Sequence, residues 1–292
     1  MTTSRQLNIV LCGLTGFGNT VLKALLKDSR VVVQACFTVK YANPFPYYPE
    51  EQLIDLCDTL RVECHDNVKV STGKGWERLR SLSPDLILVA TFNQILTRNV
   101  LELPPLGVVN VHPSLLPKLR GACPTNAAIL KGETSTGLTA HYMGEELDTG
   151  DLLLQRVVPI GREEYDGELR AKLARLAGDM VPPLLDLFAG FTKPKGTPQD
   201  NTRATQAPKP LPEEGFLETE TDPDRLARKI RALNPIPGTS ILVGGERIPV
   251  QRYEWLLTQS PAGVRVENGW VDLALGGRAI RLFRNDTLSI GG

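Results

Sequence analysis

Short apolar runs alternate with longer amphipathic stretches over roughly the first 190 residues. Apolar runs of strand length occur at 7–12, 31–37, 86–90 and 108–111, and between them the apolar positions recur with helical spacing at 17–27, 49–60 and 74–82. Strands that are apolar throughout and separated by helix-length segments are typical of a parallel sheet covered on both faces. The pattern predicts an α/β fold with a doubly wound, mostly parallel sheet, which is a Rossmann-like arrangement.

Two further strands are expected at 135–143 and 152–159, followed by a long helix over 165–188 that we expect to be interrupted or kinked near Pro182-Pro183. The next stretch, 192–212, is rich in Pro, Thr, Gln, Asn and Lys and has no apolar periodicity, which favours a surface linker. We therefore predict a first domain over 1–191, a linker over 192–212 and a second domain over 213–292.

The second domain reads as one helix and a series of short strands. The helix is expected at 222–233, and the strand-like runs at 240–243, 248–255, 264–266, 270–275 and 280–283. Gly244-Gly245, Asn268-Gly269 and Gly276-Gly277 separate several of these runs as hairpin turns. The pattern predicts a small C-terminal β-barrel-like domain of the OB-like kind.

The overall composition limits the kinds of binding partner that the chain could attract. The 292 residues carry 33 Lys+Arg and 33 Asp+Glu, so the formal net charge is zero. The chain as a whole therefore has no excess positive charge that would attract nucleic acid or an acidic membrane. Five cysteines with no C-x-x-C pair favour reduced thiols, and neither a signal peptide nor a membrane span is evident. We expect a cytoplasmic protein without a membrane partner. Whether it forms a homodimer is left open.

Three glycines follow the first predicted strand and open a helix. Gly13, Gly16 and Gly18 stand where backbone amides and a helix N-terminus can hold an anion, which makes Gly13 a candidate for substrate binding. Their spacing is G-x-x-G-x-G rather than the G-x-G-x-x-G of dinucleotide sites. The alternative is that they only permit a tight turn and close packing.

Candidate chemistry gathers where the strand at 108–111 ends. Asn110 and His112 alternate onto one face of that strand, at the edge of the sheet where ligands bind in such folds. Arg120 follows a loop stiffened by prolines and is a further candidate for substrate binding. Asp148, in Leu-Asp-Thr-Gly-Asp, is either a catalytic carboxylate or a turn residue that caps its own backbone.

These segments closely resemble the folate-dependent formyltransferases. The resemblance rests on Asn-Val-His-Pro-Ser-Leu-Leu-Pro-x-x-Arg-Gly from 110, Thr-Gly-Leu-Thr-Ala-His-Tyr-Met from 136 and Leu-Asp-Thr-Gly-Asp from 147. It is specific over about 85–155 and continues more weakly through Ala-Pro-Lys at 207 and Asn-Pro-Ile-Pro-Gly at 234. The latter segments look like the start of the C-terminal domain in members that act on tRNA or sugars.

The resemblance implies transfer of a formyl group from 10-formyl-tetrahydrofolate, as co-substrate, to a primary amine. It places Asn110, His112 and Asp148 on the catalytic triad. The positions that it places on the folate pocket are Leu86, Ile87, Val89, Phe92, Ile95, Ser114, Leu115, Leu116, Gly144 and Leu147. Thr-Phe-Asn at 91–93 departs from the Ala-Tyr-Gly of many members, which leaves the details of folate binding there open.

Physical chemistry agrees with these roles. Attack of the amine makes an oxyanion, which the Asn110 amide and the His112 ring could stabilise, while Asp148 assists proton transfer. No metal is needed for this reaction. The three histidines, His65, His112 and His141, have no spacing suited to zinc.

The amine is expected to be small. The segment 39–51 holds one lysine, two glutamates and four aromatic residues, so Tyr47 and Tyr48 are candidates to stack on a base or sugar, or else form a packed lid. From Arg203 onward there are 12 Lys+Arg against 11 Asp+Glu, too even a balance to favour a polyanion. His-Tyr-Met at 141 resembles the sugar-modifying members. We favour a nucleotide-linked amino sugar or another small amine over tRNA.

Two other classes are compatible with parts of the chain. A nicotinamide-dependent oxidoreductase would use the glycine loop at Gly13, but it would leave the segment from Asn110 unexplained. A non-catalytic binding protein would retain folate binding and lack all transfer activity.

Overall fold

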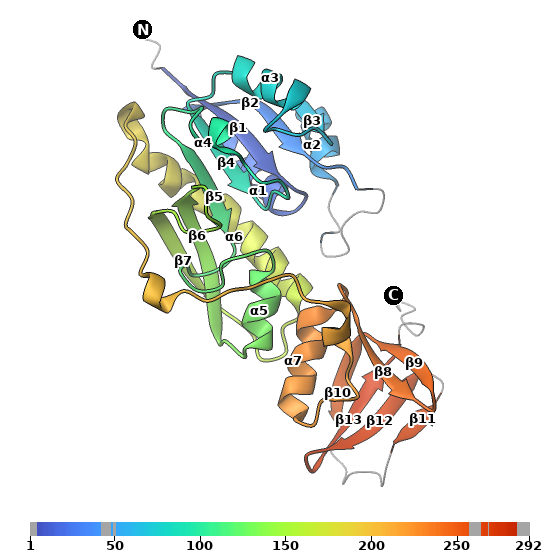
Figure 1. Ribbon diagram of the computed structural model, residues 1–292. Helices are drawn as coiled ribbons and strands as arrows, with labels where there is room; N and C mark the ends of the chain where they lie inside the picture. The colour runs from blue at the N-terminus through green and yellow to red at the C-terminus, as the bar shows by residue number, and fades with distance from the viewer. Residues whose placement is uncertain (1–4, 42–47, 49–50, 257–263, 268, 285–292) are drawn as a thin grey trace. The chain divides into compact units, whose positions relative to one another are not determined.

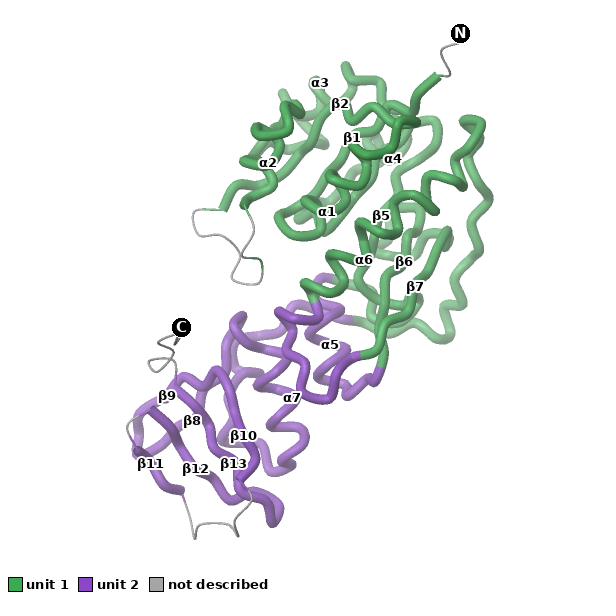
Figure 2. Tube along the Cα trace, turned by 180° about the vertical axis from the view of Figure 1, so that it is seen from behind, with its two compact units in different colours: residues 1–121, 135–159, 170–206 green, residues 122–134, 160–169, 207–292 purple. Residues whose placement is uncertain are grey.

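The computed structural model describes residues 5–41, 48, 51–256, 264–267 and 269–284. The chain forms two compact units (Figure 2). Unit 1 comprises residues 1–121, 135–159 and 170–206, and unit 2 comprises 122–134, 160–169 and 207–292. The domain boundaries expected at 191 and 212 stay a prediction.

Unit 1 is built on a seven-stranded sheet in the order β3-β2-β1-β4-β5-β6-β7 (Figure 1). The strands are β1 (Leu7–Gly13), β2 (Val31–Thr38), β3 (Cys64–Asp66), β4 (Leu86–Ala90), β5 (Val108–His112), β6 (Ser135–Tyr142) and β7 (Leu152–Pro159). The first five are parallel, whereas β6 and β7 continue the sheet antiparallel. The expected mostly parallel, Rossmann-like sheet is confirmed.

Helices connect the parallel strands. They are α1 (Phe17–Leu25), α2 (Leu53–Thr59), α3 (Gly73–Ser81) and the short α4 (Arg98–Leu101). The long α6 (Asp166–Leu187) follows β7, and two 3-10 turns, η1 (Ala189–Phe191) and η2 (Asn201–Arg203), come after it. The sequence pattern missed β3 and α4, which are only three and four residues long.

Helix α6 continues through Pro182 and Pro183, so it is not interrupted there, and the alternative of a kink stays a prediction. Proline removes a backbone hydrogen bond and is costly within a helix. Here the neighbouring apolar residues Val181, Leu184 and Leu185 are at most 2% exposed. Their burial favours continuation of the helix, because each buried aliphatic side chain contributes about 1.5–3 kcal/mol.

The order of the strands determines where a ligand can bind. The chain moves outward from β1 to β3 and then returns to β4 on the other side of β1. In open α/β sheets this reversal leaves a crevice beyond the carboxyl ends of the strands. Gly13, Ala90 and His112 are the last residues of β1, β4 and β5, so the Asn110 segment lies at the same edge of the sheet as the glycine turn.

Unit 2 contains α5 (Pro124–Leu130), η3 (Pro212–Gly215), α7 (Pro223–Leu233) and two antiparallel sheets. Strands β8 (Thr239–Val243) and β9 (Glu246–Val250) form a hairpin. Strands β10 (Arg252–Leu256), β11 (Arg265–Glu267), β12 (Trp270–Leu275) and β13 (Arg278–Phe283) form a sheet in the order β10-β13-β12-β11. These sheets agree with a small β-rich domain, and closure into an OB-like barrel stays a prediction.

The single strand expected at 248–255 is in fact two strands. β9 ends at Val250 and pairs with β8, whereas β10 begins at Arg252 and pairs with β13. The backbone N–H of Gln251 between them already donates to the Phe283 carbonyl at 3.1 Å. The chain therefore changes sheets at one residue, and no loop separates the two strands in the sequence.

The two units have separate apolar cores. In unit 1 one cluster includes Val10, Phe37, Ile87 and Val89. In unit 2, Leu226 and Ile230 of α7 pack with apolar residues of the sheets. Among the described residues, no helix is both long and apolar enough to cross a membrane.

Candidate active site

Two strands bring the polar side chains of the site together. In the antiparallel pairing of β5 with β6, Asn110 lies directly opposite His141 and His112 opposite Thr139. Residues two apart on a strand share a face, and directly opposed residues share it too. Asn110, His112, Thr139 and His141 therefore form one polar patch in a region of the sheet that is otherwise apolar.

His112 is fixed in one tautomer by the loop that follows it. Its Nε2 lies 2.9 Å from the Leu119 carbonyl oxygen, and because a carbonyl can only accept, Nε2 carries the hydrogen. In the neutral ring Nδ1 is therefore unprotonated, and it lies 3.6 Å from Oδ2 of Asp148. The ring is 4% exposed. Nδ1 is thus the ring atom available for proton transfer, and it faces a carboxylate.

His141 determines the orientation of Asn110. Its Nδ1 lies 2.8 Å from its neighbour's carbonyl, that of Tyr142, so Nδ1 is the donor and Nε2 has the lone pair. Asn110 Nδ2 donates to that Nε2 at 3.3 Å. The second hydrogen of the Asn110 amide is then free to donate to a ligand, and Asn110 is the only partly exposed residue of the patch.

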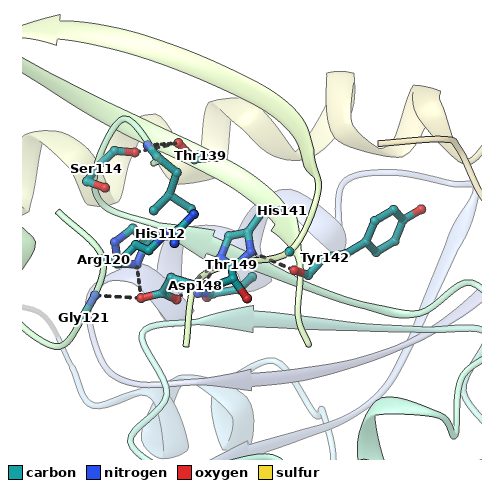
Figure 3. Close-up of polar contacts among 12 residues, drawn as sticks. His112, Ser114, Arg120, Gly121, Thr139, His141, Tyr142, Asp148 and Thr149 are labelled. Atoms are coloured by element: carbon teal, nitrogen blue, oxygen red, sulfur yellow. Dashed lines mark hydrogen bonds and ion pairs between the residues drawn. The ribbon is translucent and has the colours of Figure 1, made fainter. Parts of the chain in front are cut away.

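Asp148 lies between the two imidazoles (Figure 3). Its Oδ1 is 3.6 Å from His141 Nε2, its Oδ2 is 3.6 Å from His112 Nδ1, and the Gly121 backbone N–H donates to Oδ2 at 2.9 Å. The two rings are nearly perpendicular, at 83°, with centroids 6.2 Å apart. The carboxylate is 7% exposed and its residue has a φ of 55°, in the left-handed region.

The surroundings keep Asp148 ionised and His112 neutral. Burial by itself raises the pKa of Asp148, but His141 and His112, when their rings are protonated, and the Gly121 amide outweigh it, so this pKa lies below its ordinary value. Burial lowers the pKa of His112, and the attraction of Asp148 and the Leu119 carbonyl only partly opposes it. Near pH 7 the site therefore holds one negative charge and an imidazole that can accept a proton.

A distant segment holds the Asp148 loop in place. Gln199 Nε2 donates to the carbonyls of Asp148 and Gly150, both at 2.8 Å. Its Oε1 accepts from Nη2 of Arg120 at 2.7 Å, and that Nη2 also donates to Asn201 Oδ1 at 2.8 Å. Arg120, predicted for substrate binding, is 6% exposed and held by this segment.

The segment that includes Gln199 is fastened to unit 1 over some length. Thr197 pairs with Leu152, and Gln206 forms a bridge with Arg120. The Arg120 backbone N–H donates to the Thr205 carbonyl at 2.9 Å, and the Thr205 hydroxyl accepts from the Leu119 N–H at 2.9 Å. Part of the stretch expected as a linker thus supports the loops on either side of the site.

The Thr139 hydroxyl and the Gln155 amide hold the proline-rich loop after β5 in place. Thr139 Oγ1 donates to the Ser114 carbonyl at 2.7 Å and accepts from the Leu116 N–H at 3.1 Å. Gln155 Nε2 donates to the Leu116 carbonyl at 2.8 Å. The Leu116-Pro117 peptide bond is cis. These contacts hold the backbone from which Leu119 fixes the His112 ring.

The positions implied for the folate pocket fall into two groups. Leu86, Ile87, Val89, Ser114 and Leu116 are at most 3% exposed, so the side chains of the first three lie in the core of the sheet. Phe92 and Leu115 are partly exposed, and Gly144 is exposed. Ile95 and Leu147 lie on the loops after β4 and β6 and are 88% and 66% exposed.

The residues expected at the acceptor side have different surroundings. Gly13 is buried at the end of β1, where a Cβ would come within 3.2 Å of the Ala90 carbonyl oxygen. Tyr48 is 8% exposed, and its ring packs against Gly16, whose φ is 92°. A Cβ at Gly16 would overlap the Tyr48 ring, so this glycine is needed for the packing. Tyr47 lies outside the described residues.

Two residues of the site were not selected from the sequence, His141 and Gln199. His141 could have been found from the His-Tyr-Met segment, had the register of β6 against β5 been known. Gln199 carries no local signal, because its contacts are with loops about 50 and 80 residues earlier. In the described part of the chain, no group of three or more His, Cys, Asp or Glu is arranged to hold a metal ion.

Comparisons with known proteins identify the family. A profile described as formyl transferase matches residues 49–185. Methionyl-tRNA formyltransferase of Marinobacter nauticus is 31% identical over 290 residues, which cover 94% of this chain and 90% of the relative. The chain belongs to the formyl transferase family.

Other relatives match over part of their length or by fold. Methionyl-tRNA formyltransferase of Syntrophus aciditrophicus is 42% identical over 174 residues, or 60% of this chain, and the match spans only 55% of that relative's length. The crystal structure of WlaRD, a sugar 3N-formyl transferase solved with dTDP and 5-N-formyl-THF, has a TM-score of 0.72 at 14% identity. It covers 98% of this chain and all of WlaRD.

Proposed function

We propose that this protein transfers a formyl group from 10-formyl-tetrahydrofolate to the primary amine of a nucleotide-linked amino sugar or another small amine. The observation that carries the proposal is the position of Asp148 between the His112 and His141 rings, with Asn110 oriented by His141. Membership of the formyl transferase family supports the same reaction. Asn110, His112 and Asp148 are the proposed catalytic residues.

Asn110 stabilises the oxyanion in this proposal. When the amine nitrogen attacks the formyl carbon, the carbonyl oxygen gains negative charge and needs a donor that is already oriented. One hydrogen of the Asn110 amide is directed to His141 Nε2, and the other is free. Because the amide does not need to rotate to meet the oxyanion, a donor of this kind lowers the barrier by about 2.7–4 kcal/mol.

His112 and Asp148 handle the proton. The attacking nitrogen becomes cationic and must lose a proton, while the folate nitrogen must gain one as its bond to the formyl carbon breaks. His112 Nδ1 accepts the first proton, and the charge of Asp148, 3.6 Å away, stabilises the imidazolium. His112 can then return a proton to the leaving nitrogen. No covalent enzyme intermediate is required.

The folate co-substrate fits the exposed apolar side chains near the site. Ile95 and Leu147 lie on loops that follow two strands of the sheet, at 88% and 66% exposure. Large apolar side chains left open to solvent beside a polar patch are typical of ligand sites. We propose that they cover the flat ring system of the folate, with Phe92 as a partly buried wall.

The charge of the chain favours a small acceptor. The net charge is zero, and the 12 Lys+Arg from Arg203 onward nearly balance the 11 Asp+Glu. RNA binding depends on neutralising phosphates with an excess of basic side chains. A single nucleotide-linked sugar makes no such demand.

Charged initiator methionyl-tRNA is the second candidate acceptor. A specific observation favours it, since the relative that matches 94% of this chain is a methionyl-tRNA formyltransferase. The catalytic steps would be the same for both acceptors, because each presents a primary amine.

The experiment measures release of tetrahydrofolate from 10-formyl-tetrahydrofolate with a panel of nucleotide-linked amino sugars beside charged initiator methionyl-tRNA. The variants are Asn110→Ala and His112→Ala. His65→Ala is the matched control, because His65 also pairs with a carboxylate, Glu63 at 2.6 Å, but lies on β3 away from the site.

We expect turnover with one sugar, a loss of about 100-fold or more in Asn110→Ala and His112→Ala, and no change in His65→Ala. Turnover with the tRNA alone would replace the favoured acceptor by the second one. Full activity of His112→Ala with any acceptor would refute the proposed mechanism.

A further inference from the structure

A cavity of about 450 Å³ lies entirely within unit 2. Its walls come from the end of α5, the turn between β7 and α6, one side of α7 and strand β10. None of the residues that line it belongs to the candidate active site. It is large enough for a small organic ligand.

One face of α7 supplies the charged wall. Asp224, Ala227, Arg228 and Arg231 line the cavity and follow helical spacing, so they point to the same side. The opposite face of α7, with Leu226 and Ile230, packs in the core of unit 2. Because the helix is held by its apolar face, the two arginines have a fixed backbone.

The guanidinium groups of Arg228 and Arg231 have few hydrogen-bond acceptors and no carboxylate partner among the described residues. Arg231 is 9% exposed and donates from Nη1 to the Glu164 carbonyl at 3.1 Å, but its Nε is buried and has no acceptor. Arg228 Nε is also buried without an acceptor, and among the described residues no carboxylate lies within 4.0 Å of either guanidinium. Buried guanidinium donors without acceptors are unfavourable unless a ligand supplies them.

Two of the acidic residues around the cavity are already engaged. Asp224 accepts from Arg278 Nη1 at 2.8 Å, and Glu163 accepts a short hydrogen bond from the Tyr253 hydroxyl. Glu133 is the third acidic residue of the wall, and it forms no ion pair with either arginine among the described residues. With Asp224 and Glu163 engaged, the two guanidinium groups of Arg228 and Arg231 stand against the single carboxylate of Glu133, so the remaining charge is positive on balance.

Aromatic side chains form the wall that β10 supplies. Tyr253 and Trp255 meet edge to face, with ring centroids 5.6 Å apart. The Arg278 guanidinium lies 3.5 Å from the Trp255 ring centroid, which holds the indole in place. A ligand in the cavity therefore meets the guanidinium groups of Arg228 and Arg231 on one side and an aromatic surface on the other.

We propose that this cavity binds the phosphate group of a small molecule through Arg228 and Arg231. Guanidinium groups present donors in a fork that matches the oxygens of a phosphate. The site goes beyond the proposed function, because it shares no residue with the formyl-transfer site. The cavity favours a small phosphate over RNA, because a volume of about 450 Å³ holds a small molecule and not a stretch of polynucleotide.

The test follows the Nε–H signals of arginine in a ¹⁵N–¹H NMR spectrum of the full chain. The probes are inorganic phosphate, a nucleoside 5′-diphosphate and a short RNA, each added at constant ionic strength without folate or amine. Arg228→Gln removes one of the two guanidinium groups of the proposed site. Arg265→Gln on β11 is the control, since it removes one positive charge from the same unit and does not line the cavity.

We expect inorganic phosphate to shift the Nε–H signals of Arg228 and Arg231 saturably. Arg228→Gln should weaken binding about tenfold or more, since a charge-assisted hydrogen bond is lost, while Arg265→Gln stays within about twofold. A diphosphate that binds more tightly and also shifts the Trp255 indole signal identifies a nucleotide. Equal affinity for both probes identifies a simple phosphate ester.

Three results would overturn the inference. They are the absence of a saturable shift with either small probe, an unchanged affinity in Arg228→Gln, and binding of the RNA alone. Arg228→Lys is included to separate charge from geometry, and it should bind phosphate more weakly than the native chain does. Formyl transfer is assayed separately, so failure of the proposed enzyme activity and failure of this site are distinguishable.

Discussion

Replacing Gln199 with alanine removes the side chain that holds the Asp148 loop. The change deletes two hydrogen bonds to the Asp148 and Gly150 carbonyls and one acceptor of the Arg120 guanidinium. Each neutral bond contributes about 0.5–1.5 kcal/mol and a charged one about 1.5–3 kcal/mol. Asn201 still accepts from Arg120 at 2.8 Å, which preserves part of the charged term.

The free energy of unfolding should therefore fall by about 2–4 kcal/mol in Gln199→Ala. The rate should fall as well, because Asp148 holds a left-handed φ of 55° that a non-glycine residue adopts at a cost of about 1–2 kcal/mol. Without Gln199 the loop relaxes and the carboxylate moves. A displacement of about 1 Å costs about 100-fold in rate.

Gln199→Glu separates the two halves of the amide. It keeps an acceptor for Arg120 but replaces the donor to the Asp148 carbonyl with an oxygen that repels it. Urea denaturation should show stability closer to the native value than in Gln199→Ala, whereas the turnover number should fall in both variants. Native stability and native turnover in Gln199→Ala would refute the reasoning.

Two further predictions concern pH and a glycine. The folded-state pKa of His112 is lowered, so the unfolded chain binds more protons than the folded chain once the pH falls below about 6.5. The free energy of unfolding should therefore decline as the pH falls further, by up to about 1.4 kcal/mol per pH unit. Denaturation of His112→Asn between pH 7 and 5 should lack this component, and equal slopes in both proteins would contradict the buried neutral imidazole. Gly150→Ala should lose at least about 2 kcal/mol of stability, because a Cβ there overlaps the Tyr142 carbonyl oxygen. Gly144→Ala is its control, since no atom lies within 4 Å of a Cβ at Gly144, and equal melting temperatures of the two variants would count against the packing argument.

The sheet of unit 1 was predictable because buried parallel strands are continuous apolar runs. β4, with all five residues buried, is the clearest case. The shared face of Asn110 and His112 follows from the two-residue period of a strand. Both inferences depend only on residues that are close in sequence, so they do not require knowledge of the rest of the fold.

Other features depend on register and on distant contacts. His141 reaches Asn110 only because β6 pairs antiparallel with β5 in one register, and a shift of one residue would turn it to the other face. Gln199 acts on Asp148 across 51 positions of sequence. The place of Asp148 itself was inferred from resemblance, since the Leu-Asp-Thr-Gly-Asp segment is equally suited to an ordinary turn.

The Gln199 contacts also have a consequence for synthesis of the chain. The amino-terminal part of a chain emerges first from the ribosome during synthesis. Asn110 and His112 appear early, but the loop carrying Asp148 is held by Gln199, and Arg120 by Gln199 and Asn201. All strands of the sheet in unit 1 are therefore synthesised before Gln199, the residue that holds the Asp148 loop. A protein released prematurely after α6 would contain every strand of that sheet and lack the side chain that supports its carboxylate.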